Sequence, residues 1–357
     1  MQMRSIVVCW IFLLATGSLE ARIVVSRRVY SEHGRTWRQL WMASSESLDF
    51  GQLTHSARDH AYPLCSRDGK LIYFVSDRDG ARSLNAYAGA NNRELWALDR
   101  QTGQERLVWQ TSDDLGLYPI GTSADGAVLI RVGTEVRSLW HPWSINNVVP
   151  TNDAPPAVSP DGRALAIVIA GSFDKQGQSH DANLFVVDTA TGQSRIQVGN
   201  YETPAWSPDG TRIAAIGDNG LAIIDVATHK EVARAGWPKP DAPPQDLVWS
   251  PDGKYVLAGL YGEDDGAGDP QSDYFLLNVA AGTWTPVLTA RQVVWLQGGG
   301  TLLYLRPFAT TPLTPGSTHA VWTAQLAVFD LATHKDTELT TGLVLNDYIS
   351  SCGPLNK

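Results

Sequence analysis

The sequence has few cysteines, a deficit of positive charge and only one long apolar run, and each shortage excludes a class of protein. Lysine and arginine number 28 against 37 aspartates and glutamates, which gives a net charge of −9. A nucleic-acid partner needs a basic surface that displaces counterions from phosphates, so this charge argues against one. The charge fits a soluble protein and is compatible with a cationic ligand or a basic peptide.

Catalytic motifs are absent too. The chain contains no Gly-x-Ser-x-Gly elbow, no His-Glu-x-x-His zinc motif, no Cys-x-x-Cys pair and no phosphate-binding glycine loop. Its eight histidines are scattered, and His229 and His334 both lie in Ala-Thr-His-Lys segments that we expect to be surface turns. The sequence therefore favours a binding scaffold over an enzyme.

The one apolar run lies at the N-terminus. Arg4 precedes the apolar stretch Ile6–Ala15, and small residues follow as far as Ala21. The stretch has ten residues, fewer than the roughly 20 that span a bilayer. The pattern predicts a signal peptide over residues 1–21 and an exported domain over residues 22–357, in the periplasm or outside the cell. An uncleaved anchor is the alternative.

A Ser-x-Asp-Gly tetrapeptide recurs along the chain between apolar segments. Its five copies are Ser66–Gly69, Ser123–Gly126, Ser159–Gly162, Ser207–Gly210 and Ser250–Gly253. A degenerate sixth copy lies at 297–300. Glycine accepts the positive φ that a tight turn requires, so each copy predicts a hairpin. The copies recur roughly every 45 residues, the length of one four-stranded propeller blade.

The segments around each turn repeat as well. A short apolar strand precedes the turn and often ends in Trp, as at Trp206, Trp249 and Trp295. After the turn come a second strand, a third that ends in Asp or Asn, as in Glu94–Asp99, and a polar outer strand. Four antiparallel strands per repeat predict an all-β fold, a single β-propeller. The second repeat departs from this pattern, because Trp140–Trp143 stands where a regular third strand is expected.

These repeats resemble the Trp-Ser-Pro-Asp-Gly repeats of the translocation protein TolB family, which also occur in the propeller domains of prolyl-oligopeptidase-type peptidases. The clearest copies are Trp206–Gly210 and Trp249–Gly253, and the similarity extends over nearly all of residues 22–357. The resemblance implies a TolB-like, WD40-like propeller with a mouth that receives a partner segment. It is specific for the fold and not for the function, because such propellers have many roles.

The two ends of the chain predict how the ring closes. Three strand-like runs, Ile23–Val29, Arg38–Ala43 and Gly51–Thr54, lie before the first complete repeat. At the other end, Asn346–Gly353 is similar to Asp59–Ser66, the start of the first repeat. We predict a seventh blade made from both ends, with the C-terminus as its innermost strand, which removes an open sheet edge. Six blades, as in the TolB family, are the alternative.

This arrangement brings two cysteines together. Cleavage of the signal peptide removes Cys9 and leaves Cys65 and Cys352, an even number for an oxidising compartment. The two occupy near-equivalent positions on neighbouring innermost strands, which predicts a disulfide. Two buried free cysteines that act as small apolar residues are the alternative.

Polar residues just ahead of the innermost strands are the candidate binding site. In a propeller these positions surround one mouth of the central channel, where charge of one sign attracts cations or basic peptides. The candidates are Asp59, His60, Asp114, Asp153, Glu202, Asp246, Arg291 and Asp347. The alternative is that these residues only cap the ends of strands.

Two acidic loops are weak candidates for calcium, which prefers six to eight oxygen ligands. Their carboxylates are Asp77, Asp79, Asp264 and Asp265. Neither loop has the full spacing of a calcium-binding loop, so we interpret both as solvated turns and expect no cofactor.

Aromatic residues are a further candidate for recognition. Trp140, His141 and Trp143, with Trp237 and Trp322 elsewhere, are able to stack against sugar or peptide. Packing of outer strands is the alternative explanation.

The sequence therefore predicts a periplasmic or extracellular, non-enzymatic propeller that binds a protein or peptide of the cell envelope through one face and the channel mouth. The alternative is a propeller-fold lyase or glycoside hydrolase that acts on polysaccharide through carboxylates at the mouth, because paired acids need only the right separation. A metal-dependent lyase needs several converging histidines, and only His60 is well placed.

Overall fold

The computed structural model describes most of the chain after the N-terminal segment. The described residues are 22–30, 35–44, 48–56, 58–77, 82–83, 93–111, 116–149, 156–173, 179–242, 244–262, 271–296, 298–307, 309–312, 320–341 and 344–352. The predicted signal peptide, residues 1–21, lies outside them.

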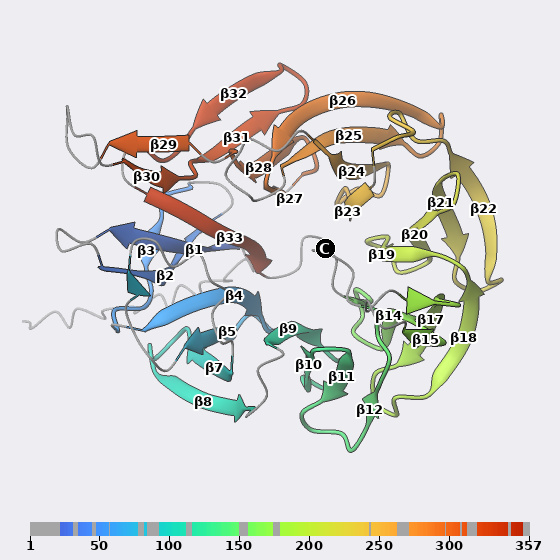
Figure 1. Ribbon diagram of the computed structural model, residues 1–357, viewed down its shortest axis with the longest axis horizontal. Coiled ribbons are helices and arrows are strands. Elements are labelled where there is room, and N and C mark those ends of the chain that lie inside the picture. The colour runs from blue at the N-terminus through green and yellow to red at the C-terminus, as the bar shows by residue number, and fades with distance from the viewer. Residues whose placement is uncertain are drawn as a thin grey trace, which may run out of the picture.

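Seven four-stranded antiparallel blades stand in a ring around a common axis (Figure 1). The fold is a seven-bladed β-propeller, which confirms the predicted class and the choice of seven blades over six. Every regular element of the described residues is a strand.

Blades 1 to 3 follow the order of the chain, each from its innermost strand outward. Blade 1 contains β4 (Asp59–Cys65), β5 (Leu71–Asp77), β7 (Glu94–Asp99) and β8 (Glu105–Gln110). Blade 2 contains β9 (Leu117–Thr122), β10 (Val128–Val132), β11 (Glu135–Ser138) and β12 (Ser144–Ile145). Blade 3 contains β13 (Ala157–Val158), β14 (Ala164–Ile169), β17 (Asn183–Asp188) and β18 (Ser194–Gly199).

Blades 4 to 6 continue in the same way. Blade 4 contains β19 (Glu202–Trp206), β20 (Arg212–Gly217), β21 (Gly220–Asp225) and β22 (Lys230–Ala235). Blade 5 contains β23 (Pro244–Trp249), β24 (Tyr255–Tyr261), β25 (Ser272–Asn278) and β26 (Thr283–Ala290). Blade 6 contains β27 (Gln292–Trp295), β28 (Thr301–Leu305), β31 (Leu326–Asp330) and β32 (Lys335–Glu338).

Blade 7 is built from both ends of the chain, as predicted. From the axis outward it contains β33 (Val344–Cys352), β1 (Arg22–Tyr30), β2 (Arg35–Ser44) and β3 (Gly51–Gln52). Three short additions complete the strand list: β6 (Arg82–Ser83), which pairs with β2, and the hairpins β15 (Ser172–Phe173) with β16 (Ser179–His180) and β29 (Ala309–Pro312) with β30 (Ala320–Thr323).

A disulfide fixes the closing strand. β33 pairs antiparallel with β1 from Val29 opposite Val344 to Arg22 opposite Cys352. The structure joins Cys352 to Cys65 of β4, with a Cα–Cα distance of 5.1 Å, so the predicted disulfide links blade 7 to blade 1. It closes a loop over most of the chain, for which chain-entropy models give roughly 4–5 kcal/mol of stabilisation.

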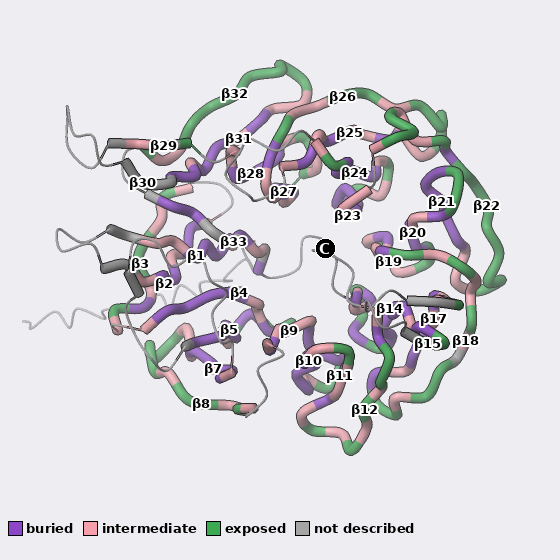
Figure 2. The backbone as a smooth tube through the Cα atoms, viewed as in Figure 1, coloured by how far each residue is buried: buried purple, intermediate pink, exposed green. Residues whose placement is uncertain are grey.

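The hydrophobic core lies between neighbouring blades. Apolar side chains of β14 and β17 pack against β20 and β21 of the next blade, and the other side of blade 4 packs against blade 5. Outer strands such as β22 and β32 are exposed over nearly their whole length, because the blades diverge toward the rim (Figure 2).

Tryptophans on the innermost strands join consecutive blades. The Nε1 of Trp206 donates to the carbonyl of Ala157 in blade 3 at 2.8 Å, and the Nε1 of Trp249 donates to Ala205 in blade 4 at 3.0 Å. Trp295 makes the equivalent bond to blade 5. The recurring Trp therefore fills the space between blades while its N–H satisfies a partly buried carbonyl.

The repeated Ser-x-Asp-Gly turns share one set of hydrogen bonds. In blade 4, the Oγ of Ser207 donates to the Oδ1 of Asp209 at 2.6 Å, and the N–H of Gly210 donates to the Ser207 carbonyl at 2.9 Å. Gly210 has a φ of 71°, in the left-handed region that glycine adopts without strain. The predicted hairpins are confirmed at all five copies, which join β4 to β5, β9 to β10, β13 to β14, β19 to β20 and β23 to β24.

Blade 2 corrects one expectation. The third strand of this blade is β11, and Trp140–Trp143 lies after it, in the turn that leads to β12. The pattern was misleading because β11 has only four residues and ends in Ser138, without the Asp or Asn that ends the third strand of the other repeats.

No helix in the described part of the chain is long and apolar enough to cross a membrane.

Candidate functional site

The two faces of the ring are built from different connections. The turn face carries the Ser-x-Asp-Gly turns, which join the first strand of a blade to its second. The loop face, opposite, carries the N-terminal ends of the innermost strands and the connections from one blade to the next. Because the strands of a blade are antiparallel, the predicted binding residues that the structure describes at the starts of innermost strands belong to the loop face: Asp59, His60, Glu202, Asp246 and Arg291.

Turns pack against one another on the turn face near the axis. The N–H of Ala124 donates to the Gly162 carbonyl at 2.8 Å, and a Cβ added to Gly162 would lie 2.7 Å from that same nitrogen. A Cβ on Gly210 would lie 3.8 Å from Pro160, and one on Gly253 would lie 3.5 Å from Pro208. The Pro of one turn therefore lies beside the Gly of the next in blades 3 to 5.

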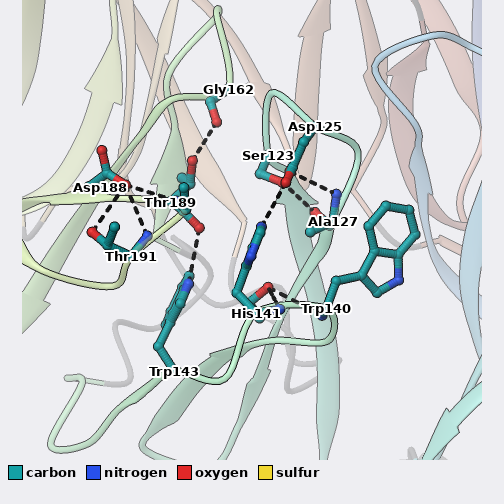
Figure 3. A network of polar contacts seen from close by, with 12 residues as sticks. Ser123, Asp125, Ala127, Trp140, His141, Trp143, Gly162, Asp188, Thr189 and Thr191 are labelled. Atoms are coloured by element: carbon teal, nitrogen blue, oxygen red, sulfur yellow. Dashed lines mark hydrogen bonds and ion pairs between the residues drawn. The ribbon is translucent and has the colours of Figure 1, made fainter.

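Aromatic residues of blade 2 are mostly used within the turn face (Figure 3). The Nε1 of Trp143 donates to the carbonyl of Thr189 in blade 3 at 3.0 Å, and the Nε2 of His141 lies 2.8 Å from the Oδ2 of Asp125. Trp140 differs, because 60% of its surface is exposed. Two of the three residues thus hold neighbouring turns together. Trp237 packs beside Trp284, and the side chain of Trp322 is outside the described part.

On the loop face, Asp59 is a buried structural residue. Its carboxylate is paired with the guanidinium of Arg38 from β2, and its Oδ1 accepts the backbone N–H of Arg38 at 2.6 Å. Burial alone raises the pKa of Asp59, but the charge and hydrogen bonds of Arg38 outweigh it and lower the pKa below its ordinary value. Asp59 is only 6% exposed, so it ties blade 1 to blade 7 and does not present its charge to solvent.

His60 is fully buried beside this ion pair. Its Nδ1 lies 2.8 Å from the Thr54 hydroxyl and its Nε2 lies 3.2 Å from the Ser56 hydroxyl. Its ring packs edge-on against Phe74 at 4.6 Å. Burial lowers the pKa of His60 to about 4, so the imidazole is neutral at pH 7. These contacts give His60 a structural role in the closing junction.

Arg291 also contacts the closing blade. Its Nη1 donates to the carbonyl of Asn346 in β33 at 3.3 Å. The next residue, Gln292, donates from Nε2 to the Ile349 carbonyl and accepts the Ile349 N–H at Oε1, both at 3.0 Å. This pair of bonds positions β33 against blade 6, a contact that sequence reasoning missed.

Asp246 and Glu202 have different environments. The Oδ2 of Asp246 accepts the hydroxyl of Tyr274 at 3.0 Å. The Asp246 carboxylate lies against Gly259 of β24. A side chain at Gly259 would collide with it, because a Cβ there would lie 2.1 Å from the Asp246 Oδ1. Glu202, at the start of β19, is exposed to solvent.

The remaining predicted residues are less defined. Asp347 lies in β33, where the register with β1 shifts between Ser26 and Arg27, and its side chain is outside the described part. Asp114 and Asp153 lie outside the described residues, as do the calcium candidates Asp79, Asp264 and Asp265 and the side chain of Asp77. Among the described residues, no group of three or more His, Cys, Asp or Glu is placed to hold a metal ion.

A groove of about 980 Å³ opens on the loop face beside blade 5. One wall is the segment 238–242, which connects β22 to β23. The ends of the blade 5 strands, among them Tyr261, Asp273 and Thr289, line it, and Pro307 of blade 6 borders it. Its size is typical of a ligand-binding site, and it holds none of the predicted mouth residues.

The wall formed by 238–242 is held in place from several directions. The Nε1 of Trp284 donates to the Gly236 carbonyl at 2.7 Å, and the rings of Trp237 and Trp284 lie 6.0 Å apart. Pro238 and Pro240 fix their own φ angles. Sequence reasoning missed this wall, although the proline-rich stretch from Trp237 to Gln245 was a visible signal.

Asp273 anchors the wall to blade 5. Its Oδ2 lies 2.6 Å from the Nζ of Lys239, and its Oδ1 accepts the hydroxyl of Thr289 at 2.6 Å. Partial burial raises the pKa of Asp273, but the bonds from Lys239 and Thr289 outweigh it and lower the pKa. The charges of Lys239 and Asp273 therefore neutralise each other within the groove.

Comparison with known proteins shows similarity of fold. No protein-family model and no curated protein sequence matches the chain. Among solved structures it is similar to TolB from Acinetobacter baumannii, with 12% identity, a TM-score of 0.52 and coverage of 94% of this chain and 68% of TolB. It is similar to a candidate 6-phosphogluconolactonase from Bacteroides uniformis, with 17% identity, a TM-score of 0.58 and coverage of 94% and 100%.

A lyase has the same architecture. An oligogalacturonate lyase from Vibrio parahaemolyticus is 13% identical, with a TM-score of 0.53 and coverage of 88% of this chain and 92% of the lyase. Identities this low show a shared propeller fold and do not carry a function over.

Proposed function

We propose that the protein is an exported, non-enzymatic propeller that binds a protein or peptide of the cell envelope through its loop face. The observation that carries this proposal is the groove beside blade 5. Its wall, the segment 238–242, is held in place by the contacts of Trp284 and Asp273. A fixed wall lowers the entropy that binding costs, which favours a recognition role.

Export is supported by two features. The Cys65–Cys352 disulfide is typical of oxidising compartments such as the periplasm. The N-terminal segment has the charge, apolar core and small residues of a signal peptide. The similarity of fold to TolB agrees with an envelope partner, and the TolB-like family is the one we propose for this chain.

The chemistry of the mouth also favours binding over catalysis. Asp59 is already paired with Arg38, and His60 is buried and neutral at pH 7. Neither group is available as an acid, base or ligand without opening the closing junction. The alternative, a polysaccharide lyase or glycoside hydrolase, would have to use other carboxylates, of which Glu202 and Asp246 are the described mouth candidates.

Site-directed crosslinking in envelope extract tests the proposal. p-Benzoylphenylalanine introduced at Thr289 in the groove should give a discrete protein adduct on irradiation. The same probe introduced at Trp140, on the turn face, should give none and is the matched control. Loss of the adduct on competition with unlabelled protein would establish saturable binding.

A parallel screen for polysaccharide degradation distinguishes the alternative. We expect no turnover. Turnover that Glu202→Gln or Asp246→Asn abolishes, with no adduct at Thr289, would overturn the binding function in favour of the enzyme.

A further inference from the structure

One carboxylate in the groove is not neutralised. Asp241 lines the groove and is exposed, and no hydrogen-bond or ion-pair partner is found for it among the described residues. The other two charged residues of the described lining, Lys239 and Asp273, are paired at 2.6 Å. The described lining therefore carries a net negative charge, located at Asp241.

An aromatic ring faces the same groove. Tyr261 ends β24 and is 40% exposed, which is high for a large side chain in this protein. The face of a tyrosine ring attracts a cation within about 6 Å of its centre, and a nearby carboxylate adds to this attraction. A tyrosine and an unneutralised carboxylate in one groove are a combination that favours a Lys or Arg side chain.

The rest of the lining is suited to a peptide backbone. Pro238, Pro240 and Pro307 provide apolar surface without backbone N–H groups of their own, so they offer packing and no competing donors. Because Trp284 and Asp273 hold the wall, little reordering is needed on binding. A short extended segment therefore fits this groove, with its basic side chain directed to Asp241.

We propose that the groove beside blade 5 binds an extended peptide segment that contains a Lys or Arg, recognised by Asp241 and Tyr261. This inference rests on the proposed binding function and names the chemistry of its partner. The peptide is attracted by charge complementarity, in agreement with the overall net charge of −9.

A phage-displayed library of random nonapeptides tests the inference on the full-length, disulfide-bonded protein. We expect enriched peptides to contain Lys or Arg. A synthetic copy of the best peptide should bind at least tenfold more tightly than its Lys→norleucine or Arg→norleucine analogue. Its affinity should fall as salt rises from low to high concentration.

Variants of the two recognition residues give the second readout. Asp241→Asn and Tyr261→Ala should each weaken binding of that peptide at least fivefold, while both variants keep a cooperative thermal unfolding transition. Asp218→Asn, another exposed aspartate on the loop face, and Trp140→Ala, an exposed aromatic on the turn face, should leave the affinity unchanged.

Three outcomes would overturn the inference: no enriched peptide, enriched peptides without basic residues, or equal losses in the control variants. Binding of an oligosaccharide that Asp241→Asn and Tyr261→Ala abolish would assign the groove to sugar instead. If the crosslink at Thr289 forms but the library fails, the binding function stands and only the peptide assignment is lost. If neither is observed, both are lost.

Discussion

The turn face and the loop face of this propeller differ in how much of their structure the repeat dictates. On the turn face, nearly identical tetrapeptides make the same hydrogen bonds in blades 1 to 5, and in blades 3 to 5 the Pro of one turn lies beside the Gly of the next. On the loop face, connections of different length and composition produce one groove and several individual polar contacts. The comparison teaches that the repeat builds the scaffold, while departures from it build the candidate site.

The closing junction is an exception, because it places buried polar groups at the loop face. Asp59→Ala should have the largest effect on stability, since it removes the buried carboxylate that is paired with the Arg38 guanidinium and accepts the Arg38 N–H. We expect the free energy of unfolding to fall by about 3–5 kcal/mol, measured by urea denaturation. The exposed Asp218→Ala is the control and should stay within about 0.5 kcal/mol. A loss below about 1 kcal/mol for Asp59→Ala would mean that the junction is not structural.

His60 predicts how this junction responds to pH. Its pKa is about 4 when folded and about 6.5 in the unfolded chain, so between these values only the unfolded state binds the proton. Stability should therefore be unaffected by His60 above pH 6.5 and should decrease as pH falls, by about 3 kcal/mol at pH 4. Chemical denaturation of wild type and His60→Gln across pH 4–7 checks this. Parallel curves for the two proteins would contradict the prediction.

Two glycines with the same backbone conformation separate packing from backbone strain on the turn face. Gly162 and Gly103 have φ angles of 73° and 71°, but only Gly162 has close neighbours where a Cβ would be placed. Gly162→Ala should lower the free energy of unfolding by roughly 2–4 kcal/mol, because alanine is strained in the left-handed conformation and its Cβ collides with the neighbouring turn. Gly103→Ala has only the backbone strain and should lower it by roughly 1–2 kcal/mol. Thermal unfolding of both variants measures the difference. Equal losses would show that turn-to-turn packing contributes little.

The smallest effect on stability is expected in the groove. Tyr261 is 40% exposed, so Tyr261→Ala removes only part of the buried surface of a core aromatic residue and should lower the free energy of unfolding by about 1 kcal/mol. Thermal unfolding checks this value. A loss of 2 kcal/mol or more would mean that the ring belongs to the core. The groove of blade 5 would then be part of the scaffold and would not differ from the turn face in its contribution to stability.

Local patterns in the sequence were sufficient for the fold. The spacing of the Asp-Gly pairs predicted the blades, and the likeness of Asn346–Gly353 to Asp59–Ser66 predicted the closing strand and the pairing of Cys65 with Cys352. These predictions succeeded because turns and strand alternation depend on short-range sequence. The third strand of blade 2 was missed because β11 has only four residues and lacks the terminal Asp or Asn of the other third strands.

The candidate site could not be derived in the same way. The position of Asp59 at the start of an innermost strand was read correctly, but its burial depends on Arg38, which arrives from a different blade. The groove depends on the distance between Lys239 and Asp273, which lie 34 residues apart. Neither relation is encoded in a local pattern.

The sequence by itself favoured seven blades over six, and predicted the strand that closes the ring and the cysteines that join it, because each follows from a repeat and its two incomplete ends. Only the tertiary structure decided which polar residues are structural and where a ligand has room. The physical reason is that burial and charge pairing are set by neighbouring blades, whose contacts join residues far apart in the chain.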